Sequence, residues 1–426
     1  MKLIASKSRL KGIVCIPGSK SHTIRAVTVG SLATGESIIR RPLVSSDTLS
    51  AVDCYRALGA EIDTSDKQLW RVKGTGGKVK LPSHTIDVGN SGTTLRLAMG
   101  SAALAASSEK VVFTGDEQIQ SRPLAPLIKA LGELGAKCKS IKDNGKAPVE
   151  ICGGLVGGKI SIACPTSQYL SSLLLCTPLA PADSEIDVTL LNEPGYVQMT
   201  VDWLDRQNIK YENRGLTWFR MKGGQRYSGF DYTIPADFSS ATFFLCAAAL
   251  FGDNVKIVGL DFSDSQPDKA VVDYLKAMGA NITIEGGSVT VRSGQLAGIE
   301  IDMNATPDAL PAMAVTAAYA KGRTRLFNVA QARTKETDRI KCMAEELGKV
   351  GVATDEFADG LSIIPARLNG GEVSGRGDHR IVMAMAMAGL GSDEKIIVDT
   401  AEAMSVTFPD FVELMQSLGA DMKVVD

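Results

Sequence analysis

The segment Ala277-Met278-Gly279-Ala280-Asn281-Ile282-Thr283-Ile284 ends a helical pattern at a glycine and continues as a strand. A glycine just past a helix adopts the left-handed conformation that lets the chain turn back into a strand. The same combination occurs five more times, at Gly59, Gly135, Asn208, Gly351 and Gly419, with asparagine as the cap in one copy. In chain order, the six caps are 76, 73, 71, 72 and 68 residues apart. The chain therefore consists of six repeats of about 70 residues.

A second marker repeats with nearly the same period. It is a polar cluster followed by a helix of small apolar residues, and it occurs at Lys20, Gly92, Ser167, Phe238, Asp308 and Arg380. These positions are 72, 75, 71, 70 and 72 residues apart. A helix rich in Ala, Leu and Met with almost no charge must be enclosed on nearly all sides. We expect this helix to be the buried one in each repeat.

Each repeat reads as a strand, a buried helix, a strand, an amphipathic helix and then one or two strands. Alternating strands and helices place the protein in the α/β class. Because the period exceeds that of common solenoids, we expect six small βαβαββ subdomains rather than an open array. They should gather into two lobes of three subdomains, each lobe built around buried parallel helices.

We predict that one lobe covers residues 17–232 and the other covers residues 1–16 and 233–426. A first strand over Leu3–Ile16 then belongs to the second lobe. The chain would cross between the lobes near residues 16–17 and 230–235, which would form a double hinge. Two hinged lobes suit closure around a small ligand.

The composition is that of an ordinary globular protein, with 46 basic and 48 acidic residues. This balance gives no case for a general binder of nucleic acid or of acidic membranes. Because there is neither an apolar signal region nor a run of 18 uncharged apolar residues, we expect no secretion signal and no transmembrane helix. Eight cysteines without a CxxC pair favour reduced thiols in the cytoplasm. Three histidines far apart in sequence give no support for a metal site.

Several basic residues lie at or beside predicted helix starts, where the helix dipole disfavours positive charge. They are Lys20, Arg122, Lys335, Arg339 and Arg380. Two helices are predicted to start in this way, one at Arg333–Arg339, running towards Val350, and one at Ser121-Arg122-Pro123. A bound anion would make these positions favourable, because the cations and the free N–H groups would converge on it. The alternative for any single position is a capped helix with solvated charges.

Two acids lie among these cations, Asp308 and Glu336, and both are candidates for proton transfer. Three polar turns are further candidates: Gly18–Ser21 followed by Arg25, Gly89–Thr94 followed by Arg96, and Thr166-Ser167-Gln168. Their small or hydroxyl-bearing residues can cap a helix or let backbone N–H groups approach an anion. The chain has neither the spacing of a P-loop nor a GxGxxG turn after a strand, so nucleoside triphosphates and dinucleotides are disfavoured.

Eight motifs follow in the order PGSKSHTIR, GNSGTTLR, SRPL, TSQYL, DMNATPDALP, RTKETDR, GDHR and TFPDF. In this order they resemble the 5-enolpyruvylshikimate-3-phosphate synthase family from end to end of the chain. The resemblance implies the two-lobed enolpyruvyl transferase fold. It also implies transfer of the enolpyruvyl (carboxyvinyl) group of phosphoenolpyruvate to the 5-hydroxyl of shikimate 3-phosphate, with release of phosphate by addition and elimination. This step belongs to the shikimate pathway to chorismate and aromatic amino acids, and it implies no metal and no organic cofactor.

The resemblance also implies roles for particular residues. Asp308 corresponds to the base at the 5-hydroxyl, Glu336 to the acid that protonates the enol methylene, and Lys20 to a further catalytic residue. Phosphoenolpyruvate would contact Lys20, Asn90, Gly92, Arg122, Gln168, Arg339 and Arg380. Shikimate 3-phosphate would contact Lys20, Ser21, Arg25, Thr166, Ser167, Gln168, Tyr196, Asp308, Gln331 and Lys335.

The chain departs from the family pattern at several positions. The stretch Asn192-Glu193-Pro194-Gly195-Tyr196 lacks the serine that the family usually has beside a basic residue, which puts one phosphate contact in doubt. Val406 replaces a lysine that some members carry on the phosphoenolpyruvate side. Gln331 stands where many members have asparagine, and Thr166 replaces a serine.

Two alternatives remain beside this interpretation. The sister transferase that acts on UDP-N-acetylglucosamine has the same fold, but it typically has Lys-Asn where this chain has Lys20-Ser21. It also usually carries a reactive cysteine near Gly115–Arg122, where this chain has none. A non-catalytic, clamp-like scaffold around nucleic acid would need a basic lining, which a net charge of −2 does not favour. We expect a cytoplasmic monomer that binds small anionic substrates and neither nucleic acid nor membranes.

Overall fold

The computed structural model describes residues 1–106 and 108–426, and these fall into two compact units. Unit 1 consists of Met1–Pro17 and Pro235–Asp426, and unit 2 consists of Gly18–Ile234. The chain passes from one unit to the other after Pro17 and after Ile234. The sequence predicts these crossings after residues 16 and 232. Each unit encloses a hydrophobic core of its own.

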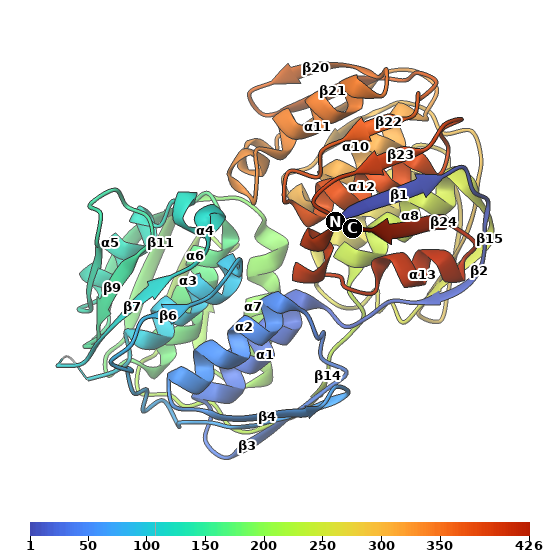
Figure 1. Ribbon diagram of the computed structural model, residues 1–426. Helices are drawn as coiled ribbons and strands as arrows, with labels where there is room; N and C mark the ends of the chain where they lie inside the picture. Colours follow the sequence, from blue (N-terminus) through green and yellow to red (C-terminus); the bar gives the residue numbers. More distant parts are fainter. Residues whose placement is uncertain (107) are drawn as a thin grey trace. The chain divides into compact units, whose positions relative to one another are not determined.

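One repeat of unit 1 illustrates the building block. In chain order it contains β18 (Glu300–Asp302), α10 (Leu310–Ala318), β19 (Thr324–Phe327), α11 (Arg339–Lys349), β20 (Ala353–Phe357) and β21 (Gly360–Ile364). The strands form one sheet in the order β18-β19-β21-β20, in which β18 and β19 are parallel and the other pairs are antiparallel. This is the predicted βαβαββ arrangement. Figure 1 shows α11 beside β20 and β21, and α10 nearer the other buried helices of unit 1.

The other two sheets of unit 1 use both ends of the chain. Their strands are β16 (Asn281–Glu285), β17 (Ser288–Arg292), β15 (Gly252–Val258) and β2 (Leu10–Cys15) in one, and β22 (Gly371–Val373), β23 (Ile396–Val398), β1 (Lys2–Ser6) and β24 (Asp421–Val425) in the other. Since β1 pairs with β24, the two termini lie close together (Figure 1). The predicted single strand over Leu3–Ile16 is therefore wrong. After β1, the polar run Lys7-Ser8-Arg9 leaves the sheet that contains β24. The chain then enters the sheet that contains β15 at Leu10, where β2 begins.

Unit 2 contains three further sheets of four strands. They are β14 (Asp231–Thr233)-β3 (Glu36–Arg40)-β5 (Leu69–Lys73)-β4 (Glu61–Asp66), β6 (Ile86–Asp87)-β7 (Lys110–Thr114)-β9 (Val149–Cys152)-β8 (Lys137–Ser140), and β10 (Gly158–Cys164)-β11 (Ser184–Leu191)-β13 (Trp218–Met221)-β12 (Tyr211–Asn213). The first sheet takes β14 from the far end of the unit, and β14 runs parallel to β3. The ends of unit 2 are thereby joined in one sheet.

The first helix of each repeat is enclosed, as the sequence predicts. These helices are α1 (Lys20–Leu32), α3 (Gly92–Ala102) and α6 (Ser167–Cys176) in unit 2, and α8 (Phe238–Phe251), α10 and α12 (His379–Gly389) in unit 1. Every residue of α3 and of α12 is buried. Their small side chains let the helices of one unit pack against each other, as α3 does with α6 and α10 with α12.

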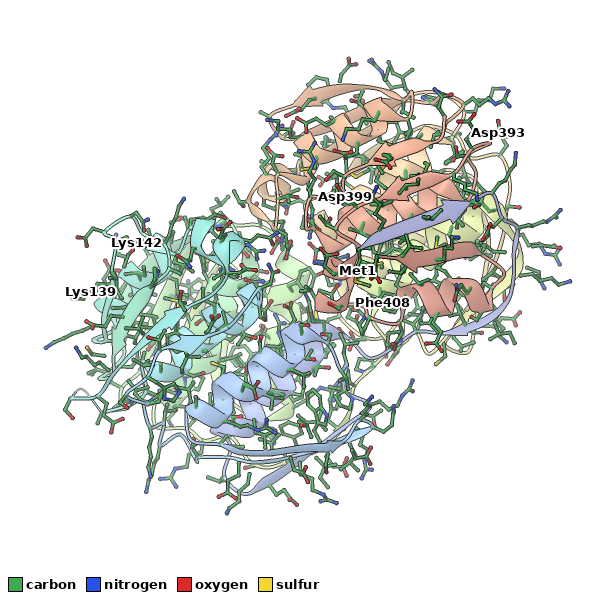
Figure 2. All side chains as sticks on the ribbon, viewed as in Figure 1. Met1, Lys139, Lys142, Asp393, Asp399 and Phe408 are labelled. Atoms are coloured by element: carbon green, nitrogen blue, oxygen red, sulfur yellow. The ribbon has the colours of Figure 1, made fainter. Side chains whose placement is uncertain are left out.

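The second helix of each repeat covers its sheet with one apolar face. These helices are α2 (Ser46–Ala57), α5 (Ala125–Glu133) and α7 (Pro194–Arg206) in unit 2, and α9 (Ala270–Ala277), α11 and α13 (Phe411–Ser417) in unit 1. The remaining helical segments are short. They are the helix α4 (Glu117–Ser121) and the 3₁₀ turns η1 (Thr177–Leu179), η2 (Pro267–Lys269), η3 (Pro307–Ala309), η4 (Ala330–Thr334) and η5 (Ala401–Val406). Phe408, after η5, packs against Phe244 and Phe411 in the core of unit 1 (Figure 2).

The six helix caps adopt the backbone conformation that the sequence predicts. Their φ values are all positive and extend from 54° at Asn208 to 107° at Gly135. Left-handed residues of this kind end each second helix and redirect the chain into the next strand. The repeat read from the sequence is therefore a structural repeat.

Candidate active site

The predicted site residues fall into two groups, one in each unit. Unit 2 contains Lys20, Ser21, Arg25, Asn90, Gly92, Arg122, Thr166, Ser167, Gln168 and Tyr196, and unit 1 contains Asp308, Gln331, Lys335, Glu336, Arg339 and Arg380. These two groups are the unit 1 cluster and the unit 2 cluster.

Arg339 is the centre of the unit 1 cluster, and its side chain is only 1% exposed. Its Nη1 donates to Asp308 Oδ1 at 2.7 Å, its Nε donates to Asp378 Oδ2 at 2.8 Å, and its Nη2 pairs with Glu336. Burial disfavours a charged guanidinium, but the carboxylates of Asp378, Glu336 and Asp308 outweigh this effect and raise the pKa of Arg339. The guanidinium is therefore permanently charged and held by three acids.

Asp308 lies in the turn η3, directly before α10. Besides Arg339, its carboxylate meets Arg380 Nη2 at 3.0 Å and Lys335 Nζ at 3.9 Å. Burial raises the pKa of this carboxyl, but the charges of Arg380, Lys335 and Arg339 outweigh burial and hold the pKa well below its usual range. With a side chain 19% exposed, Asp308 is an accessible carboxylate among three cations.

The start of α12 supplies two more members of the unit 1 cluster. Asp378 caps this helix by accepting from the backbone N–H of Arg380 at 2.9 Å, as its type and place predict. Arg380 then donates through Nη2 to Ser239 Oγ at 2.8 Å. His379 lies between Asp378 and Arg380 in the sequence. Burial lowers the pKa of His379 to about 3, so this imidazole is neutral.

The predicted helix start at Arg333 is wrong. Helix α11 begins at Arg339, capped by Asp338, whose carboxylate accepts from the N–H of Lys341 at 3.0 Å. Asp is a strong N-cap residue and Arg is not, so the local chemistry favours the later start. Lys335 and Glu336 therefore lie in the loop between η4 and α11. Gln331, in η4, donates to the carbonyl oxygen of Asn304 at 3.0 Å.

The unit 2 cluster begins at α1, where Ser19 is the N-cap and Lys20 the first residue. Lys20 Nζ lies 3.1 Å from Asp47 Oδ2. One turn later, Arg25 is buried and donates to Ser21 O at 3.1 Å, and to groups of α7, namely Thr200 Oγ1 at 2.9 Å and Tyr196 O at 2.9 Å. Burial lowers the pKa of Arg25 to about 10, which still leaves it charged at neutral pH.

Two buried guanidiniums converge on Gly92, the first residue of α3. A Cβ added at Gly92 would lie 2.6 Å from Nη1 of both Arg96 and Arg122. Arg96 also donates to Gln168 Oε1 at 2.9 Å, and Gln168 donates to Thr93 Oγ1 at 3.0 Å. This corner therefore combines two cations, an amide and the start of a buried helix, which is a suitable environment for an anion.

Arg122 reaches this corner from a loop, and Asn90 lies in the turn before α3. The Asn90 amide donates to Asp116 Oδ2 and Gln118 Oε1, each at 2.7 Å. The prediction that Arg122 starts a helix is wrong, because it follows the last residue of α4 and α5 begins only at Ala125. Asp116 caps α4 by accepting from Ile119 N–H at 2.9 Å, so that a separate short turn precedes Arg122.

The third corner of the unit 2 cluster lies at the start of α6. Thr166-Ser167-Gln168 heads this helix, as predicted, with Thr166 as the N-cap residue and Ser167 as the first helical residue. Glu193 is buried here. Its Oε2 accepts from Ser167 Oγ at 2.8 Å, from Ser167 N–H at 3.2 Å and from Thr166 Oγ1 at 3.4 Å.

Sequence reasoning missed several members of these clusters as site residues. They are Asp47, Ser239, Thr337 and Asp378. Thr337 and Asp378 stand inside the motifs RTKETDR and GDHR, so their positions were available in the sequence. Asp47 and Ser239 carry no local signal, because only the packing of distant segments brings them to Lys20 and Arg380.

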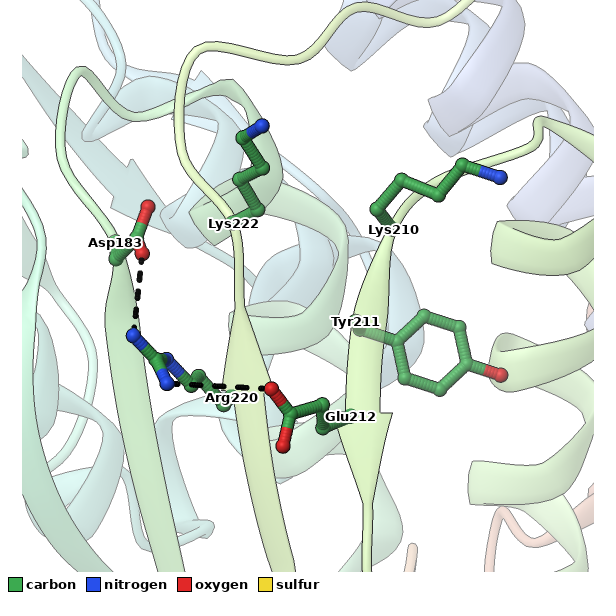
Figure 3. Close-up of a pocket in the computed structure, with 6 residues that line it drawn as sticks. All are labelled: Asp183, Lys210, Tyr211, Glu212, Arg220 and Lys222. Carbon is green, nitrogen blue, oxygen red and sulfur yellow. Dashed lines mark ion pairs between the residues drawn. The ribbon is translucent and has the colours of Figure 1, made fainter.

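A separate hollow on unit 2 is lined by none of the predicted site residues. An open hollow of about 330 Å³ on unit 2 is lined by Asp183, Lys210, Tyr211, Glu212, Arg220 and Lys222 (Figure 3). Arg220 is shared there between Asp183 at 3.9 Å and Glu212 at 4.0 Å. Across the described part of the chain, no three His, Cys, Asp or Glu side chains are grouped so that they could hold a metal ion. Within residues 1–106 and 108–426, no helix has the length and apolar character needed to cross a membrane.

The comparisons with known proteins agree over the whole length of the chain. The family model for EPSP synthase (3-phosphoshikimate 1-carboxyvinyltransferase) matches residues 4–415. The chain belongs to the EPSP synthase family. Proteins named 3-phosphoshikimate 1-carboxyvinyltransferase from Acetivibrio thermocellus and Ruminiclostridium cellulolyticum are 52% and 48% identical to it, each with 100% of both chains covered.

The fold of the chain is also similar to that of a solved EPSP synthase structure. The enzyme from Acinetobacter baumannii matches with a TM-score of 0.83 and 27% identity, with 100% of both chains covered. The predicted enolpyruvyl transferase fold is thereby confirmed, and so is the predicted family. As an EPSP synthase family member the chain is an enzyme of the transferase class, which excludes the scaffold alternative.

Proposed function

We propose that this chain transfers the carboxyvinyl group of phosphoenolpyruvate to the 5-hydroxyl of shikimate 3-phosphate and releases phosphate, as a step of the shikimate pathway. The name of its full-length relatives supports the reaction. The observation that carries the chemistry is the unit 1 cluster, in which an ionised Asp308 lies among Arg339, Arg380 and Lys335. Polyanionic substrates need such cations, and the proton transfers need such acids.

Asp308 is the proposed base at the 5-hydroxyl. Three cations lower its pKa in the ligand-free protein, which makes it a weak base there. When the phosphate and carboxylate groups of the substrates engage these cations, less positive charge acts on Asp308, and its basicity rises. Substrate binding thus prepares the base for the step in which it is needed.

Glu336 is the proposed acid that protonates the enol methylene. In the ligand-free protein it pairs with Arg339. Once Arg339 turns to the carboxylate or phosphate of phosphoenolpyruvate, Glu336 loses part of this partner and gains a negative neighbour. Both changes favour its protonated form.

In the addition step, the 5-oxygen loses its proton and bonds to the carbon that bears the phosphate, while the methylene carbon gains a proton. In the elimination step, the new methyl group loses a proton and the bond from carbon to phosphate oxygen breaks. Lys20 is proposed to stabilise the negative charge that develops on the departing phosphate when this bond breaks. Holding two reactants together contributes on the order of 7–11 kcal/mol to such a reaction.

The binding roles follow the two clusters. Phosphoenolpyruvate is assigned to Lys20, Asn90, Gly92, Arg122, Gln168, Arg339 and Arg380. Shikimate 3-phosphate is assigned to Lys20, Ser21, Arg25, Thr166, Ser167, Gln168, Tyr196, Asp308, Gln331 and Lys335. The convergence of Arg96 and Arg122 on Gly92 supports the first set, and the hydroxyls at the start of α6 support the second.

We also propose that the protein acts as a monomer in the cytoplasm. Its eight cysteines are free thiols, which suits a reducing compartment. Light scattering on purified protein tests the oligomeric state, and a molar mass of twice that of the chain would reject the monomer.

The function is tested by phosphate release from purified protein with phosphoenolpyruvate and either shikimate 3-phosphate or UDP-N-acetylglucosamine. We expect release only with shikimate 3-phosphate. Asp308→Asn and Glu336→Gln should each lower kcat at least about a hundredfold, because general acid–base catalysis contributes roughly 10²–10⁴-fold. Glu300→Gln, which removes an exposed carboxylate of β18, is the matched control and should leave the rate unchanged. Release with the nucleotide sugar alone would assign the chain to the sister transferase.

A further inference from the structure

The buried carboxylate of Glu193 occupies an anion cradle. Two hydroxyls and one backbone N–H, from Thr166 and Ser167, all donate to the same oxygen of Glu193. Converging donors at the start of a buried helix bind any anionic oxygen, whether it belongs to the protein or to a ligand. In this structure the protein supplies the anion itself.

The position of Glu193 on its own segment is unusual. Glu193 is the residue before α7, its backbone is left-handed with φ 58° and ψ 48°, and it is 2% exposed. Side chains other than Gly, Asn and Asp rarely adopt this conformation. A buried acid also requires partners. Here the donors of Thr166 and Ser167 provide them.

We infer that Glu193 is a resident anion in the subsite for the phosphate group of shikimate 3-phosphate, and that it must leave this subsite before the substrate binds. The inference rests on the proposed function, which assigns Thr166 and Ser167 to that substrate. The cradle's donors cannot serve a carboxylate and a phosphate at once, and two like charges in one cradle repel each other. Glu193 therefore weakens binding of the phosphorylated substrate and sets its affinity.

A purely structural role makes different predictions. If Glu193 only caps α6, its removal lowers stability and leaves substrate affinity unchanged or weaker. If it competes with phosphate, removal of its charge tightens binding of shikimate 3-phosphate. Glu193→Gln separates the two cases, because the amide keeps an acceptor oxygen for Ser167 but has no charge. Glu193→Ser tests the same point with a side chain that cannot reach across the cradle.

The experiment measures KM for both substrates and titrates shikimate 3-phosphate and unphosphorylated shikimate by calorimetry. We expect both variants to lower KM and Kd for shikimate 3-phosphate by about tenfold, since one charge-assisted contact is exchanged. KM for phosphoenolpyruvate and Kd for shikimate should change less than about twofold. Glu212→Gln is the matched control, because it removes a carboxylate of unit 2 that is 64% exposed, and we expect wild-type values.

Two outcomes would overturn the inference. One is an unchanged or higher KM for shikimate 3-phosphate in both variants while thermal melts show that they are folded. The other is an equal affinity gain for shikimate and shikimate 3-phosphate, which would mean that the phosphate is not involved. A separate titration with inorganic phosphate keeps this test independent of the reaction. If wild-type protein is inactive with shikimate 3-phosphate, the proposed function fails, but tighter phosphate binding by Glu193→Gln still supports the resident anion and equal binding rejects it.

Discussion

Arg339, Lys20 and Ser167 have one feature in common, which is that each donates to a carboxylate of its own unit. Arg339 is held by three acids, Lys20 by Asp47, and Ser167 by Glu193. A buried cation without a partner is strongly destabilising, at about 3–5 kcal/mol for one broken pair. Carboxylates of the same unit therefore hold these three donor groups in place.

Gly92 offers a sharp test at the residue scale. An added methyl group would lie 2.6 Å from Nη1 of Arg96 and of Arg122 and would push both guanidiniums away from the start of α3. We expect Gly92→Ala to raise KM for phosphoenolpyruvate by about tenfold, as overpacking costs about 1–3 kcal/mol. Gly132→Ala in α5 is the matched control, because nothing lies within 4 Å of its Cβ position. Equal KM values for the two variants would contradict this reading of the corner.

His379 links stability to pH. Burial, reinforced by Arg380 and Arg339 and opposed by Asp378 and Glu336, lowers its pKa from 6.5 to about 3. Between these values the unfolded chain binds a proton that the folded protein does not, so the free energy of unfolding falls as pH falls from about 6.5 to about 3. From pH 7 to pH 5 this group should remove about 2 kcal/mol.

Urea unfolding of wild type and His379→Gln at pH 7 and pH 5 measures this contribution. The variant should lose about 2 kcal/mol less than wild type over the interval. His84→Gln, which replaces an exposed histidine, should behave as wild type does. Identical losses for wild type and His379→Gln would mean that His379 is protonated in the folded protein.

At the scale of elements, α11 positions the start of α12. Glu346, on α11, is fully buried and accepts from Arg376 Nε at 2.9 Å, Ser374 N–H at 2.7 Å and Lys349 Nζ at 2.7 Å. Arg376 and Ser374 belong to the segment between β22 and α12, which leads directly into Asp378 and Arg380. The buried acid thus fixes a loop whose end carries two members of the unit 1 cluster.

Glu346→Gln should therefore lower the free energy of unfolding by about 1–2 kcal/mol, because Arg376 loses one of its two carboxylate partners while its half-exposed side chain is partly screened by solvent. We also expect a lower kcat, since the start of α12 would be less well held. Glu345→Gln is the matched control: Glu345 pairs with the same arginine at 2.7 Å but is 39% exposed, and such pairs are worth less than about 1 kcal/mol. Chemical denaturation and phosphate release measure both effects. Similar losses in the two variants would reject a special role for the buried acid.

The elements also show where sequence patterns succeed and where they fail. The buried helices, the six left-handed caps and the capping role of Asp378 are local properties, and all were predictable. The pattern predicts helix starts at Arg333 and Ser121, although basic residues oppose the helix dipole there, whereas the better caps Asp338 and Asp116 decide where α11 and α4 begin. The partners Asp47 and Ser239 depend on segments far apart in sequence, which no local pattern reports.

At the scale of the whole molecule, three strands belong to sheets whose other strands lie far away in the sequence. Strand β14 joins the first sheet of unit 2, while β1 and β2 join two sheets of unit 1. Period and composition predict the number and type of repeats and their grouping into two lobes of three, and the resemblance implies the same grouping. They did not predict that residues 2–15 form two strands, because a polar break of three residues is a weak signal beside two strand patterns.

The separate cores predict separate unfolding, and the chain carries a suitable probe. All three tryptophans, Trp70, Trp203 and Trp218, belong to unit 2, so their fluorescence reports that unit, whereas far-UV circular dichroism reports both. Leu326→Ala empties part of the unit 1 core at β19, and Ile39→Ala does the same at β3 in unit 2. Each should cost about 2–5 kcal/mol.

We expect Leu326→Ala to lower the urea midpoint of the circular dichroism signal by about 1 M or more while the fluorescence midpoint stays at the wild-type value. Ile39→Ala should lower the fluorescence midpoint instead. The physical reason is that each cavity removes contacts from one core only, and two chain crossings transmit little of that loss to the other core. A fluorescence midpoint that falls equally in both variants would show that the units unfold as one cooperative body.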